Sequence, residues 1–265
     1  MNMAPLYFLA NILFFALCFY AGRSAASKGP RFAKFSAFTG LFILALQITL
    51  YFNTDIEYKL LGFNDYSYFR WWGVAGAFII TGSGYDEIKK RTPRLPMLYL
   101  ILTFLVYAFL WRLTIFNTDN EFDQAGFFKG LCLQSTGYTC APASCVTLLS
   151  RFGVKSDERE MAKLCLTQVR GTEYIDIVRG LNLKLDADKY EVRLTRETWN
   201  TLGSIPKPFI TNIYILDDIL HSVTMFDIGT SEVYFADSLA GKFRRLKKDE
   251  FLKNWDRFVI YVIKK

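Results

Sequence analysis

Residues 134–144 read Gln-Ser-Thr-Gly-Tyr-Thr-Cys-Ala-Pro-Ala-Ser, and this stretch decides how the C-terminal half of the chain folds. Cys140 stands where a polar loop gives way to apolar residues at helical spacing, which predicts a helix that Gly153 closes. Pro142 fits the first turn of that helix, because the N–H that proline lacks has no helical partner there. A thiol at the helix start lies near the positive end of the helix dipole, which favours the reactive thiolate.

Three polar residues are candidate partners of this thiol. Gln134 lies six residues before Cys140, from where its side-chain amide can fold back and donate to a developing oxyanion. His221 is the one histidine in the sequence, and its ordinary pKa suits acid–base chemistry near neutral pH, although a histidine taken alone is more often structural. Asp237 follows His221 by sixteen residues, at the end of the next predicted strand. A hairpin of that length places the two side by side, so that the carboxylate can hold the imidazole in one tautomer.

The elements around these residues predict an α+β domain, because helices come first and an antiparallel sheet follows. About 140 residues are enough to bury a core without help. Helices are expected over residues 140–152, 156–166 (with Ser156 as N-cap), 172–183 and 247–255, and strands over residues 207–215, 222–228, 232–236 and 257–263.

These stretches resemble a known family. Residues 134–144 are similar to the nucleophile motif of the bacteriocin-processing, double-glycine leader peptidases, which are papain-like cysteine peptidases. Residues 221–229 and 233–237 resemble the histidine and aspartate strands of that family, and residues 250–255 resemble its closing helix. The resemblance covers about residues 130–264, nearly all of the C-terminal half.

The resemblance implies a Cys-His-Asp triad with a glutamine oxyanion hole and no cofactor. Ala141 stands where the family usually has glycine and Ser238 where it usually has proline, and neither change removes a catalytic group. The family domain usually lies in the cytoplasm, ahead of an ABC transporter, whereas here it follows apolar stretches, and these 265 residues contain no Gly-x4-Gly-Lys-Ser/Thr phosphate loop. The implied roles are nucleophile for Cys140, base and later acid for His221, orienting carboxylate for Asp237, and oxyanion donors for Gln134 and the Cys140 backbone N–H.

Apolar and charged residues are segregated along the chain. Hydrophobic residues make up 52% of the sequence, but residues 1–111 hold only ten of the 32 Lys and Arg and five of the 25 Asp and Glu. This composition excludes a disordered chain and a small disulfide scaffold. We expect a transmembrane region over residues 1–111, a linker over residues 112–126 and a peptidase domain over residues 127–265.

Four apolar stretches predict an all-α region of four membrane-spanning helices, since a helix needs about 20 apolar residues to cross the hydrocarbon core. The third stretch is the weakest, because it is short and rich in glycine. The four stretches are residues 5–21, 35–54, 69–84 and 95–111.

The basic residues of the loops predict the orientation. The first and third loops each carry four Lys or Arg, which by the positive-inside rule places both in the cytoplasm. The domain after the fourth span then lies outside, in a multi-pass protein of a bacterial cytoplasmic membrane. If the third stretch does not span, the domain lies in the cytoplasm instead. The loop residues are Arg23, Lys28, Arg31 and Lys34, and Lys89, Lys90, Arg91 and Arg94.

Two functions fit this reading. The first is a membrane-anchored cysteine peptidase that cleaves a peptide or precursor protein near the membrane surface. The second is a non-catalytic docking module that binds a leader peptide in the same groove. The net charge of +7 comes largely from the loops and indicates no nucleic-acid partner, whereas the lipid bilayer is a partner of either form. A further membrane partner is left open.

The remaining cysteines and the last basic run carry weaker signals. Cys132, Cys145 and Cys165 are either buried core thiols or, in an oxidising compartment, partners in a disulfide. Zinc is not expected, because the chain has one histidine and no Cys-x-x-Cys. The basic run over residues 242–248 is interpreted as a solvated strand-to-helix edge or a contact with anionic lipid.

Overall fold

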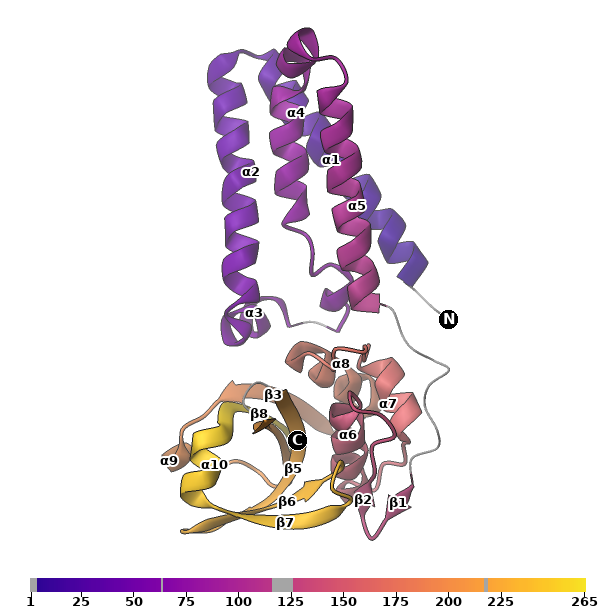
Figure 1. Ribbon diagram of the computed structural model, residues 1–265, viewed down its shortest axis with the longest axis vertical. Helices are drawn as coiled ribbons and strands as arrows, with labels where there is room; N and C mark the ends of the chain where they lie inside the picture. Colours follow the sequence, from indigo (N-terminus) through magenta and orange to yellow (C-terminus); the bar gives the residue numbers. More distant parts are fainter. Residues whose placement is uncertain (1–3, 63, 116–125, 217–218) are drawn as a thin grey trace. The chain divides into compact units, whose positions relative to one another are not determined.

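The computed structural model describes residues 4–62, 64–115, 126–216 and 219–265, and the chain forms two compact units. The first unit is all-helical, with four long helices side by side (Figure 1). Its elements are α1 (Ala4–Ser27), α2 (Pro30–Tyr51), α3 (Thr54–Leu61), the 3-10 helix η1 (Tyr66–Tyr68), α4 (Val74–Arg91) and α5 (Leu95–Ile115).

The second unit places helices first and a six-stranded antiparallel sheet afterwards, in the order β3-β8-β4-β5-β6-β7. Figure 1 shows α6, α7 and α8 grouped on one side of the curved sheet, with α9 and α10 on the other. This confirms the predicted α+β class. The elements are β1 (Phe127–Phe128), β2 (Leu131–Cys132), α6 (Cys140–Arg151), α7 (Glu158–Leu164), α8 (Tyr174–Lys184), β3 (Tyr190–Arg196), α9 (Trp199–Leu202), β4 (Phe209–Leu216), β5 (Ile219–Ile228), β6 (Glu232–Asp237), β7 (Lys242–Lys247), α10 (Lys248–Asn254) and β8 (Trp255–Lys264).

Several predicted elements need correction. The strands β3 and β7 and the short helix α9 were not expected from the sequence. The N-cap of α7 is Asp157 rather than Ser156, because the Asp157 carboxylate accepts from the Glu160 N–H at 2.7 Å. Ser156 donates instead to the Glu160 side chain. Residues 217–218, between the predicted strands over residues 207–215 and 222–228, lie outside the described residues.

Helix α6 is attached to strand β5, and this contact positions the site. All of its residues from Ala141 to Leu149 are buried. The Ser144 hydroxyl donates to the Ser222 carbonyl at 3.1 Å, and the Thr224 hydroxyl donates to the Ser144 carbonyl at the same distance. These two bonds hold the helix that begins at Cys140 against the strand that carries His221. The sheet core around Phe235 and Phe251, both fully buried, supports that strand together with α10.

In the first unit, α4 packs closely against both α1 and α2 through glycines. A Cβ on Gly82 would lie 2.1 Å from the carbonyl oxygen of Phe19 on α1, and a Cβ on Gly76 would lie 2.2 Å from that of Gly40 on α2. Small residues at both contacts therefore let the backbones approach, as in packed membrane helices. The Ser83 and Ser36 hydroxyls add a buried hydrogen bond between α4 and α2 at 2.9 Å.

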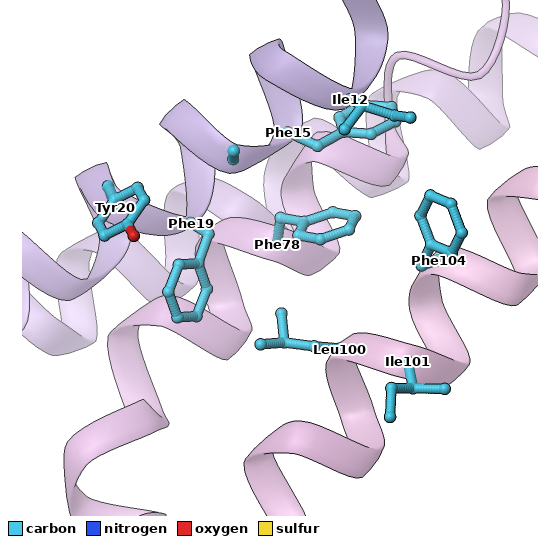
Figure 2. A pocket seen from close by; sticks show the side chains of 9 residues that line it. Ile12, Phe15, Phe19, Tyr20, Phe78, Leu100, Ile101 and Phe104 are labelled. Atoms are coloured by element: carbon cyan, nitrogen blue, oxygen red, sulfur yellow. The ribbon is translucent and has the colours of Figure 1, made fainter. Parts of the chain in front are cut away.

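Helix α5 runs antiparallel to α1. Near the start of α1, Phe8 contacts Trp111 near the end of α5, with ring centroids 5.4 Å apart. Farther along, Phe19 and Leu100 line an apolar groove of about 360 Å³ between α1, α4 and α5, which Phe78 and Phe104 also line (Figure 2). The two helices are thus in contact at one end of the unit and separated by the groove toward the other.

Within the described residues, three helices are long and apolar enough to cross a membrane: α1, α2 and, over Leu95–Arg112, α5. The prediction of four such helices is corrected to three, because α4 does not meet this criterion. Its glycines and Ser83 face the neighbouring helices, so α4 needs less apolar surface than they do. Since α5 runs in the same direction as α2, α4 carries the chain back from the end of α2 to the start of α5.

Candidate active site

Cys140 is the first residue of α6 and its side chain is half-buried. Thr139 precedes it at the N-cap position, but its hydroxyl bonds to Thr136 (3.0 Å between the two hydroxyl oxygens) and makes no bond to the helix. The first N–H groups of α6 therefore lack a side-chain cap, and the positive end of the helix dipole faces the thiol. This arrangement favours the thiolate form of Cys140.

His221 and Asp237 lie side by side on β5 and β6, as the hairpin spacing predicts. Only 2% of His221 and 3% of Asp237 is exposed, and Nε2 of the imidazole lies 3.0 Å from Oδ1 of the carboxylate. Because a carboxylate only accepts, Nε2 carries the proton and donates it. The other ring nitrogen, Nδ1, is then left to exchange a proton with the Cys140 thiol.

The Asp237 carboxylate is saturated with donors. Besides His221, Oδ1 accepts the backbone N–H groups of Leu239 at 3.1 Å and Ala240 at 3.0 Å. Oδ2 accepts from Nη1 of Arg244 at 2.9 Å. A buried carboxylate with this many donors stays ionised and keeps one orientation.

The pKa shifts agree with a thiolate–imidazolium pair. Burial acts to raise the pKa of Cys140, but hydrogen bonds and charge from His221, with hydrogen bonds from Ser222, hold it below its ordinary value. Burial acts to lower the pKa of His221, but its bonds to Asp237 and Cys140 outweigh this effect and raise the pKa to about 9. Burial likewise opposes the bonds from His221, Ala240 and Arg244, which hold the pKa of Asp237 well below its usual range.

Gln134 is joined to the strand end that carries Asp237. Its backbone N–H donates to the Ser238 carbonyl at 3.3 Å, and its side-chain Nε2 donates to the Thr136 carbonyl at 2.8 Å. The next residue in the loop, Ser135, donates its N–H to the buried Glu158 carboxylate at 2.8 Å. All four residues predicted as a site are therefore brought into one region of the domain.

Sequence reasoning missed Arg244 and Glu158. Arg244 was assigned to a solvated basic run, but it lies on β7 opposite Phe235, from where it reaches diagonally across to Asp237. The signal that could have found it is the short turn after Asp237, which makes β6 and β7 a hairpin. Glu158 lies within the predicted helix over residues 156–166, and nothing in the sequence pattern assigns it a contact with the site.

The other cysteines of the domain are free thiols in the core. Cys132, Cys145 and Cys165 are buried, and none of them is in a disulfide. Burial raises the pKa of Cys132 to about 12 and that of Cys145 well above its ordinary value. Thiols of this kind are unreactive, which leaves Cys140 as the domain's activated cysteine.

A cysteine at a helix start, facing a histidine and an acid on an antiparallel sheet, is the arrangement of a papain-like cysteine peptidase domain. The chain belongs to the Peptidase C39 family, whose model matches residues 129–265, just over half of the chain. The resemblance seen in residues 134–144 is thereby confirmed.

Two relatives match the same part of the chain. The lactococcin-G-processing and transport ATP-binding protein of Lactococcus lactis subsp. lactis is 26% identical over 133 residues, which are 50% of this chain and only 18% of that protein. An uncharacterized protein of Methanothermobacter marburgensis is 27% identical over 143 residues, which are 53% of this chain and 94% of that protein.

Solved structures align with the same half. The peptidase domain of Streptococcus ComA, a bifunctional ABC transporter of a quorum-sensing pathway, aligns at 19% identity and a TM-score of 0.46, covering 51% of this chain and 98% of that domain. A double-glycine motif protease from an AMS/PCAT transporter, in complex with its leader peptide, aligns at 14% identity and the same TM-score, covering 54% of this chain and 94% of that one.

The paired shifts of Cys140 and His221 predict a wide pH window of thiol reactivity. The thiolate exists above the lowered pKa of Cys140, and the imidazolium exists below about pH 9. We expect iodoacetamide to label Cys140 rapidly at about pH 6, as measured by peptide mass on the full chain in detergent. In His221→Ala, labelling should rise only near about pH 8.5, as for an ordinary thiol. Identical pH curves for the two proteins would refute the pair.

The Arg244–Asp237 ion pair predicts a smaller shift of that window. Arg244→Gln removes the positive charge beside Asp237, the carboxylate that faces His221, and loss of a cation raises the pKa of the groups around it. The lower limit of the window, where Cys140 labelling rises, should move to higher pH by roughly half a unit, as expected of one partly screened charge. Arg245→Gln is the matched control, because Arg245 pairs with Glu232 at the other end of β6. Equal shifts in the two variants would contradict a specific role of Arg244.

Proposed function

We propose that this chain is a membrane-anchored cysteine peptidase that cleaves a peptide or precursor protein near the membrane surface. The observation that carries the proposal is the half-buried Cys140 at the open start of α6, with an imidazole held by a saturated carboxylate. Membership of the Peptidase C39 family supports the same chemistry. The names of the relatives, one a lactococcin-G-processing protein and one a double-glycine motif protease, favour a precursor peptide as the substrate class.

In the first half of the reaction, the Cys140 thiolate attacks the carbonyl carbon of the scissile peptide bond. The C–S bond forms while the electron pair of the C=O bond moves onto oxygen, which accepts hydrogen bonds from Gln134 and the Cys140 backbone N–H. The His221 imidazolium then gives its proton to the leaving nitrogen as the C–N bond breaks. The product of this half is a thioester on Cys140 and a free amine.

In the second half, His221 is neutral and accepts a proton from water as the water oxygen attacks the thioester carbon. The C–S bond breaks, the thiolate returns, and the acid product leaves. Asp237 accepts from Nε2 throughout, so that Nδ1 stays directed toward the reacting atoms.

The helical unit supports a membrane anchor with the peptidase domain on the outer side. The basic loops before α2 and before α5 lie at the same end of the unit, where Arg23 pairs with Asp86 at 2.8 Å. The positive-inside rule assigns that end to the cytoplasm. The start of α1 and the end of α5 lie at the opposite end (Figure 1), and the peptidase domain follows α5 in the sequence. Anchoring raises the effective concentration of substrates tethered to the same membrane.

Substitution of Cys140 or His221 should abolish cleavage without unfolding the protein. We expect Cys140→Ala and His221→Ala to remain folded, with a lower melting temperature for His221→Ala because the buried Asp237 loses a partner, but both to lose at least about 10³-fold in turnover. The measurement is N-terminal profiling of membrane proteins from cells that express each variant, since new N-termini reveal cleaved precursors. Cys18→Ala, which changes a cysteine in α1, is the matched control and should cleave normally. Unchanged cleavage in cells that express Cys140→Ala would refute the peptidase and would instead support the docking-module function.

The orientation has its own test. In a Cys140→Ala background, an impermeant maleimide applied to intact spheroplasts should label an exposed Lys253→Cys in the domain but not an exposed Lys28→Cys in the first loop. Permeabilised spheroplasts should label both. The reverse pattern in intact spheroplasts would place the domain in the cytoplasm.

A further inference from the structure

The side chain of Ser238 contacts the proposed oxyanion donor directly. Its hydroxyl donates to Oε1 of Gln134 at 2.8 Å, and its carbonyl accepts the Gln134 backbone N–H at 3.3 Å. Ser238 is only 3% exposed, so water competes little for these bonds. Gln134 is therefore held from both its backbone and its side chain by one residue that lies 104 positions later in the chain.

The two ends of the Gln134 amide are distinguished by their partners. Oε1 can only accept and Nε2 can only donate. The Ser238 hydroxyl supplies a donor to Oε1, and the Thr136 carbonyl supplies an acceptor to Nε2 at 2.8 Å. If the amide turned over, its NH2 could still donate to the Ser238 hydroxyl, but its oxygen would face the Thr136 carbonyl, which repels it. The present orientation leaves the second N–H of Nε2 for another acceptor.

We propose that Ser238 is a positioning residue that anchors the Gln134 amide in place, so that the amide, in the orientation that the Thr136 carbonyl selects, presents an N–H to the oxyanion of the tetrahedral intermediate. This inference rests on the proposed function. An amide oxygen in that place would repel the oxyanion, whereas an N–H stabilises it. Among the described residues, loss of the Ser238 hydroxyl would leave the Gln134 side chain held by its bond to the Thr136 carbonyl.

Ser238 can do this because its own position is fixed. It follows Asp237, whose Oδ1 accepts the N–H groups of Leu239 and Ala240 and so closes a tight turn around Ser238. On the other side, Glu158 holds the Ser135 N–H next to Gln134. The carboxylate that orients the imidazole and the hydroxyl that anchors the amide therefore sit on consecutive residues of one turn.

Two small probes separate the proposed role from a general disturbance of the site. p-Nitrophenyl acetate acylates Cys140: the thiolate adds to the carbonyl carbon, an oxyanion forms, and p-nitrophenolate leaves. Iodoacetamide alkylates the same thiolate with loss of iodide and forms no oxyanion. The ratio of the acylation rate to the alkylation rate therefore reports the oxyanion donors, while the alkylation rate reports the thiolate. Neither probe requires knowledge of the natural substrate.

The experiment compares the two rates in the full chain in detergent. The rates measured for Cys140→Ala are subtracted, because they report reaction at other groups. We expect the ratio to fall about 100-fold in Gln134→Ala and about 10-fold in Ser238→Ala, with the alkylation rate and its pH profile unchanged. Ser238→Thr keeps the hydroxyl and should restore most of the ratio. The double variant Gln134→Ala/Ser238→Ala should fall no further than Gln134→Ala alone. Ser231→Ala, at an exposed serine just before β6, should behave as the wild type.

Three results would overturn the inference. The first is a wild-type ratio in Ser238→Ala. The second is an additive loss in the double variant, because Ser238 would then act on something other than Gln134. The third is a slower or pH-shifted alkylation in Ser238→Ala, because the serine would then support Asp237 and the thiolate. An unreactive Cys140 in the wild type would refute the proposed function itself, and so this failure is distinguishable from the other three.

Discussion

The Asp237 carboxylate is the charge around which the peptidase domain is arranged. A buried carboxylate that lost its partners would cost several kcal/mol, and four donors from three segments of chain prevent this. Each donor is fixed in return: the imidazole on β5, the turn after β6 and the guanidinium on β7. Two sets of contacts therefore set the position of His221 relative to Cys140. One is the set of hydrogen bonds to Asp237, and the other is the pair of hydrogen bonds that hold α6 on β5.

Much of this site could be predicted from the sequence because residue type and spacing constrain it. A single histidine left no choice of base, and sixteen residues with a turn between two strands bring His221 and Asp237 together. Arg244 and Ser238 escaped prediction for a physical reason. Their roles depend on a diagonal cross-strand contact and on a contact over 104 residues, and neither follows from local patterning.

In the fold, too, elements set by local sequence pattern were predicted, whereas elements that depend on distant contacts were missed. Helices α6 and α8 were found within a few residues, because apolar residues recur along them at helical spacing. Both sheet edges, β3 and β7, were missed, because edge strands carry charges that resemble loop sequence. In the helical unit, α4 was expected to be apolar enough for a span, but packing against α1 and α2 through Gly82 and Gly76 selects small residues over apolar ones. The residues of α4 are thus selected by contacts between helices, and a hydropathy pattern gives no information on such contacts.

The lone, buried histidine also makes the protein its own spectroscopic probe. In a chain of 265 residues with one imidazole, labelling histidine with nitrogen-15 yields the signals of a single ring. Those two ring nitrogens report separately on the bond to the carboxylate and on the side toward the thiol, since Nε2 and Nδ1 face different partners. Tautomer, charge and hydrogen-bond strength at the centre of the molecule can thus be read by magnetic resonance from the intact protein in a membrane mimic, without mutating any residue to simplify the spectrum.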